Sequence, residues 1–136
     1  MSKKLPRGYR NNNPGNIRIS RSRWKGKLPK PQNDDGAFEQ FTKMEWGLRA
    51  LIRLLRDSYI LRGYDTPRKI IERYAPAVEN DTLAYIKVVS SELGIDTNEK
   101  VSRDKATIQK LVQAICKHEN GFLTDLPFER AWELSL

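Results

Sequence analysis

Cysteine and histidine are nearly absent from this sequence, which holds one of each, Cys116 and His118. A single cysteine excludes an intrachain disulfide and zinc sites built from several cysteines. A single histidine is a poor basis for a metal site or a Ser-His-Asp triad, because it would have to be the whole base. We therefore expect no metal and no cofactor, with Cys116 in the core and His118 solvated or structural.

Long hydrophobic runs are absent as well. No apolar stretch approaches the roughly 18 residues that a membrane-spanning helix needs, and the lysines near the N-terminus precede no apolar segment of the kind found in secretory signals. We therefore expect a soluble protein with no signal peptide and no membrane span, and we also expect it to be a monomer. The length of 136 residues, 38% of them hydrophobic, predicts one globular domain over residues 1–136, with residues 1–10 as a flexible basic arm.

Acidic residues are in the minority: 17 Asp and Glu stand against 25 Lys and Arg, a net charge of +8. This excess indicates an anionic partner, and charge alone leaves nucleic acid, cell-wall polymers and lipopolysaccharide open. The basic residues are spread along the chain instead of forming one recognition helix, and no known nucleic-acid-binding motif is present. A nucleic-acid partner is therefore disfavoured.

Turn residues dominate the N-terminal part, and helix signals dominate the rest. Residues 1 to about 37 are rich in Pro, Gly and Asn, with dense turn chemistry at Asn11–Asn16 and a second turn at Asn33–Gly36. Short strands are predicted near Ile17–Ile19 and around Trp24. Apolar spacing and capping residues then predict a mainly α-helical domain, with helices over about 44–62 before Gly63, from Thr66-Pro67 to Tyr74 before Pro76, from Asn80 or Asp81 to Gly94, from Ser102 or Asp104 through Glu119, and a short one opened by Leu126-Pro127.

The strongest chemical signal lies in the last long helix. This helix carries an apolar stripe at i, i+3, i+4 and i+7 spacing, formed by Ile108, Leu111, Val112 and Ile115. Glu119 follows by four residues, on the same buried face and in the last turn. Apolar neighbours and the negative end of the helix dipole both favour a protonated carboxyl, which a glycosidase needs to protonate a leaving oxygen. Glu119 is therefore the candidate general acid.

Glu45 is the chief rival to Glu119. It lies at the start of the first long helix, where the dipole stabilises an ionised carboxylate and acidic residues are common. We therefore interpret Glu45 as a helix-start charge.

Several segments, read together, point to a family. They are Asn12–Arg18, Phe41, Gly47–Ala50, Arg73–Pro76, Glu79–Thr82 and Tyr85-Ile86 with Val89. The chain resembles small phage virion-associated lytic proteins, and part of it resembles lysozyme-like lytic transglycosylases. The resemblance covers most of residues 11 to 121 and implies a lysozyme-like fold, mainly α with minor strands near the N-terminus. It also implies cleavage of the β-1,4 bond between N-acetylmuramic acid and N-acetylglucosamine of bacterial peptidoglycan, in phage entry or lysis.

The order of the motifs departs from that of the family. The catalytic Glu usually comes first and an Asn- and Gly-rich wall follows, whereas here the Asn-rich segment comes first and Glu119 comes last. A circular permutation reconciles the two orders, because the termini of compact domains often lie close together. We therefore expect Asn12–Asn16 to abut Glu119–Gly121 in space.

The resemblance also implies roles for individual residues. Glu119 is the general acid and base, and the substrate-binding residues are Asn12, Asn13, Asn16, Arg18, Glu79 and Tyr85. The partner is bacterial peptidoglycan, with other phage structural proteins as further partners, and the protein acts on the cell wall from the virion or from the host cytoplasm. Hydrolase and transglycosylase remain open, as do two other readings: a basic nucleic-acid-binding module and a structural virion protein without catalysis.

Overall fold

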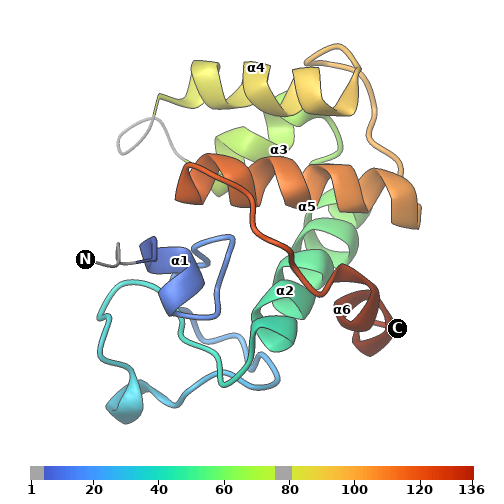
Figure 1. Ribbon diagram of the computed structural model, residues 1–136. Helices are drawn as coiled ribbons and strands as arrows, with labels where there is room; N and C mark the ends of the chain where they lie inside the picture. The colour runs from blue at the N-terminus through green and yellow to red at the C-terminus, as the bar shows by residue number, and fades with distance from the viewer. Residues whose placement is uncertain (1–4, 76–80) are drawn as a thin grey trace.

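The computed structural model describes residues 5–75 and 81–136 and confirms that the chain is mainly helical. Its α-helices are α1 (Arg7–Arg10), α2 (Met44–Arg53), α3 (Pro67–Tyr74), α4 (Thr82–Leu93), α5 (Lys105–Asn120) and α6 (Phe128–Leu134). α4 packs on both α3 and α5, α2 packs on α6, and α1 lies near the C-terminal end of α5 (Figure 1). In the described parts of the chain, no helix has the length and apolar character needed to cross a membrane.

The helix predicted over 44–62 forms, but its hydrogen bonding changes along its length. α2 passes into a π-helical turn, Leu54–Tyr59, and then into a 3-10 turn, Ile60–Arg62. The helix ends at Gly63, whose φ of 96° lies in the left-handed region that favours glycine. π-helical turns are rare and often occur at functional sites, and this one faces the pocket described below.

The predicted helix starts agree with the observed caps. Thr66 accepts a hydrogen bond from the backbone at the start of α3, and Asp81 and Asp104 do the same for α4 and α5. Asp104, and not Ser102, is therefore the cap of α5. The expectation that Pro76 ends the preceding helix falls outside the described residues.

The N-terminal part contains less strand structure than predicted. Two isolated antiparallel bridges, Arg18 with Phe38 and Lys27 with Phe41, stand where short strands were expected. Side chains bind part of the backbone here, since the Asp35 carboxylate accepts from the backbone N–H groups of Ala37 and Phe38, just after the second turn. Such local bonds compete with a sheet ladder.

Part of the expected flexible arm is folded. Arg7–Arg10 forms helix α1, and Tyr9 is 4% exposed. Its hydroxyl donates to the Phe122 carbonyl oxygen just after α5, and the two rings pack edge to face. This contact fixes the N-terminal segment to the end of α5.

Two arginines of the first long helix, Arg49 and Arg56, are buried. Arg49 Nε donates to the Leu134 carbonyl oxygen at 2.9 Å. The Arg56 guanidinium donates to the Ser135 hydroxyl and carbonyl oxygens, both at 2.9 Å, and lies over the Trp132 ring. These bonds attach α6 and explain how charged groups are accommodated inside the fold.

The segment Asn11–Asn16, here called the asparagine turn, is held by its own side chains. Asn12 and Asn16 both have φ of 53°, a left-handed conformation that asparagine tolerates. Asn13 is fully buried, and its Nδ2 donates to the carbonyl oxygens of Ile17 and Glu39. The turn therefore has one defined shape.

Three helices contact the asparagine turn from outside. Gly47 of α2 lies so close that a Cβ there would be 1.8 Å from the Asn12 carbonyl oxygen. Asn120 of α5 donates from Nδ2 to the Pro14 carbonyl oxygen at 2.7 Å, and Tyr74 of α3 donates to the next carbonyl along the turn. The predicted contact between the Asn-rich segment and the end of the Glu119 helix is thus confirmed.

Candidate active site

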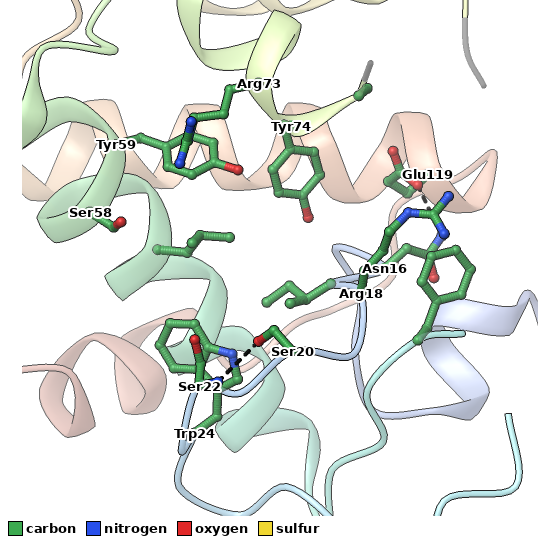
Figure 2. Close-up of a pocket in the computed structure, with 14 residues that line it drawn as sticks. Asn16, Arg18, Ser20, Ser22, Trp24, Ser58, Tyr59, Arg73, Tyr74 and Glu119 are labelled. Carbon is green, nitrogen blue, oxygen red and sulfur yellow. Dashed lines mark hydrogen bonds between the residues drawn. The ribbon is translucent and has the colours of Figure 1, made fainter. Parts of the chain in front are cut away.

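Glu119 lies in the last turn of α5, half-buried, at the edge of a pocket of about 630 Å³ (Figure 2). The pocket is bounded by the asparagine turn and the loop after it, the π-helical turn, the end of α3 and the end of α5. Within residues 5–75 and 81–136, Glu119 is the one acidic side chain that lines it. This placement makes Glu119 the natural centre of any acid–base chemistry in the pocket.

Both carboxylate oxygens of Glu119 are held. Asn16 Nδ2 donates to Oε1 at 3.0 Å, and the Tyr85 hydroxyl donates to Oε2 at 2.9 Å. Tyr85 comes from α4 and is fully buried. Burial, and then the nearby charge of Glu119, raise the pKa of Tyr85 well above its ordinary value, so its hydroxyl remains a proton donor. Three separate elements therefore fix the position of one carboxyl group.

Two further rings complete the surroundings of Glu119. The pKa of Tyr74 is raised well above its ordinary value, mainly because the side chain is buried and to a smaller extent because of the nearby Glu119 charge. The exposed His118 ring stacks on Tyr85 with 3.8 Å between ring centroids. His118 thus covers the tyrosine that holds Glu119, which agrees with the structural reading of this residue.

Aromatic and cationic side chains line the rest of the pocket. Figure 2 shows Trp24 at one end, Tyr59 with Arg73 above it on another side, and Arg18 near Glu119. The Arg18 guanidinium lies 5.2 Å from the centroid of the Phe38 ring. Flat aromatic faces beside a few polar groups suit a ligand with both apolar and hydroxyl surfaces.

The structure brings four of the predicted site residues together. Asn16, Arg18 and Glu119 line the pocket, and Tyr85 contacts Glu119 from behind. Asn16 and Glu119 are 103 residues apart in the sequence, so no local pattern could predict their contact. The prediction came from the order of the family's motifs.

Asn12 and Asn13 do not line the pocket. Asn12 donates to the Phe41 carbonyl oxygen at 3.1 Å, and the Asn13 amide is buried within the loop, as described above. The structure gives both residues a role in holding the turn that carries Asn16. Glu79 lies outside the described residues.

Glu45 is far less suited to chemistry than Glu119. It lies in the first turn of α2, is absent from the pocket lining, and stands 3.7 Å from Arg130 in an ion pair. This placement agrees with its interpretation as a helix-start charge.

Sequence reasoning missed a buried ion pair beside the pocket. Lys27 Nζ lies 2.9 Å from Glu39 Oε2 and also donates to the carbonyl oxygens of Ser20 and Ser22. Glu39 is 2% exposed. The pair holds the Ser20–Ser22 wall of the pocket, and no local motif marks it because its two members come from different loops.

Arg73 and Tyr74 were also missed as pocket residues, although they belong to a segment that carried the family resemblance. That resemblance was the signal by which the two residues could have been found.

In the described part of the chain, no group of three or more His, Cys, Asp or Glu side chains is arranged to hold a metal ion.

Comparison with known proteins found a phage relative of this chain. No family model matches it. It is 36% identical over 118 residues to Protein P5 of Pseudoalteromonas phage PM2, a match that covers 85% of this chain and 71% of the phage protein. This chain belongs to the family of phage PM2 Protein P5.

Proposed function

We propose that this protein cleaves the β-1,4 bond between N-acetylmuramic acid and N-acetylglucosamine in bacterial peptidoglycan, with Glu119 as general acid and base. The observation that supports the proposal is the half-buried Glu119 carboxyl at the pocket edge, held at both oxygens by Asn16 and Tyr85. A positioned acid within reach of a bound sugar is the central requirement of glycosidic cleavage.

In the first step, Glu119 donates a proton to the glycosidic oxygen. The protonated carboxyl carries one O–H, which must point at the glycosidic oxygen, while its other oxygen still accepts a hydrogen bond from Asn16 or from the Tyr85 hydroxyl.

In the second step, Glu119 acts as a base. Glycosidases generally use two carboxylates, whereas the described pocket lining carries one. The substrate can supply what a second carboxylate would: its acetamido group stabilises the sugar cation, and its C6 hydroxyl closes an anhydro ring after Glu119 removes the proton. Attack by water and closure of the anhydro ring therefore each need only one protein carboxyl group, that of Glu119.

The lysozyme-like fold with a circular permutation is part of the same proposal. It is supported by the asparagine turn lying against the end of α5, with Asn120 bonded to the Pro14 carbonyl oxygen. A phage relative suits a wall-cleaving role in entry or lysis, with the protein in the virion or in the host cytoplasm before release, and with other phage structural proteins as partners.

Digestion of purified peptidoglycan tests the proposal directly. We expect the wild-type protein to release soluble disaccharide-peptides, identified by chromatography and mass spectrometry. Anhydro-muramic ends would show ring closure on the C6 hydroxyl, and reducing ends would show attack by water. Folded protein that releases neither product would refute the proposed activity.

Activity is also expected to fall as salt rises. A chain with a net charge of +8 is attracted to an anionic wall polymer, and salt screens that attraction over a Debye length of about 10 Å at 0.1 M. We expect wall binding, measured by co-sedimentation with insoluble peptidoglycan, to weaken several-fold between about 50 and 300 mM salt. Far tighter binding of double-stranded DNA at the same moderate salt would favour the nucleic-acid-binding alternative instead.

A further inference from the structure

A second hollow, of about 520 Å³, lies beside the first and shares one residue with it. It is formed by the end of the first long helix and by α3, and its lining residues are Arg62, Gly63, Tyr64, Lys69, Glu72 and Arg73. Arg73 lines both hollows. Arg73 therefore stands where the two hollows adjoin.

Arg73 is oriented by two tyrosine rings. Its guanidinium carbon lies 4.6 Å from the centroid of Tyr64 and 5.5 Å from that of Tyr59. Figure 2 shows the side chain above Tyr59 at the edge of the pocket. Among the described residues, its guanidinium contacts these two rings and forms no ion pair. A guanidinium stacked on rings keeps its edge for a carboxylate.

The second hollow is cationic on balance. Three basic side chains line it, Arg62, Lys69 and Arg73, against one acidic side chain, Glu72. Lys69 stands 4.0 Å from Asp65, so its charge is only loosely paired. Tyr64 adds a ring that is 37% exposed. This lining favours a short acidic peptide over a neutral sugar. The peptide's carboxylates can pair with the basic side chains, and its backbone can pack on the Tyr64 ring.

We propose that this second hollow binds the acidic stem peptide that N-acetylmuramic acid carries on its lactyl group, with Arg73 as the residue that selects peptide-bearing glycan. The proposal rests on the function proposed above, because the peptide must leave the sugar close to the bond that is cleaved. It assigns Arg73, Arg62 and Lys69 to substrate recognition and not to the chemical step.

Peptide binding can be measured without catalysis. The probe is the soluble alanyl-glutamyl-diaminopimelate tripeptide, titrated by NMR into the full chain carrying Glu119→Gln. We expect saturable binding that Arg73→Gln weakens about fivefold, the size of one exposed charge pair, and that amidation of the peptide carboxylates weakens at least as much. Arg68→Gln is the matched control, since Arg68 also lies on α3 but donates to Asn98. Equal binding of the acidic and amidated peptides, or no effect of Arg73→Gln, would overturn the proposal.

Cleavage supplies the second readout. We expect wild-type protein to cleave intact peptidoglycan more efficiently than glycan stripped of its peptides by an amidase, and Arg73→Gln to reduce that ratio about fivefold through KM. Equal cleavage of the two substrates by the wild type would overturn the peptide proposal and leave the proposed function standing. Failure to cleave either substrate would remove the proposed function, while the titration would still report on peptide binding.

Discussion

Glu119→Gln is expected to lower the rate of peptidoglycan cleavage by at least about 10²-fold, the usual contribution of a positioned general acid. Glutamine keeps the volume of the side chain and keeps an oxygen for the 3.0 Å bond from Asn16, but it carries no transferable proton. The fold should therefore persist while the chemistry fails. The measurement is turnover on purified peptidoglycan, with circular dichroism and thermal unfolding to establish that the variant is folded.

Glu45→Gln is the matched control, because it makes the same chemical change on another helix. Glu45 pairs with Arg130 and is absent from the pocket lining, so substantial activity should remain. A folded Glu119→Gln variant with near-wild-type turnover, beside an inactive Glu45→Gln variant, would move the active site to the start of α2.

Gly47→Ala is expected to lower the free energy of unfolding by about 3 kcal/mol or more, at the upper end of the cost of overpacking. The new Cβ would lie 1.8 Å from the Asn12 carbonyl oxygen and 2.8 Å from its carbonyl carbon. Both are backbone atoms of a buried turn, so no side chain can swing away to make room. Alanine's helix preference, about 1 kcal/mol over glycine, offsets only part of this cost.

Chemical denaturation of Gly47→Ala beside Gly94→Ala separates the clash from the loss of a glycine. Gly94 has φ of 67° with nothing within 4 Å of its Cβ position, so alanine there costs only the left-handed backbone, about 1–2 kcal/mol. Two variants of equal stability would show that the turn and α2 do not press together as described. Displacement of the turn would also take Asn16 away from Glu119.

The helices could be predicted because their signals are local. Thr66 and Asp81 cap helices that begin one residue later, and Gly63 and Gly94 end helices with left-handed backbone. Each signal acts within one helical turn. The contact of Asn16 with Glu119 was predicted differently, from the reversed order of the family's motifs.

The features that sequence reasoning missed depend on distant parts of the chain. The burial of Arg49 and Arg56 could not be predicted, because nothing near them in sequence shows that backbone carbonyls at the end of α6 accept their hydrogen bonds. Asn13 and Asn16 are the same residue type in the same turn, yet one points into the loop and the other at Glu119. Backbone geometry decides between them, and composition does not report it.

The contacts around Glu119 also bear on the order of folding. Helices α3, α4 and α5 are consecutive and pack on one another, whereas the bonds from Asn16 to Glu119, from Asn120 to Pro14 and from Tyr9 to Phe122 join residues 103, 106 and 113 positions apart. Closing such long loops costs entropy before any contact repays it. The helical core can thus assemble while the proposed catalytic carboxyl still lacks its asparagine partner. In a refolding experiment, recovered activity would report the final docking of the N-terminal segment, and recovered helical signal would report an earlier event.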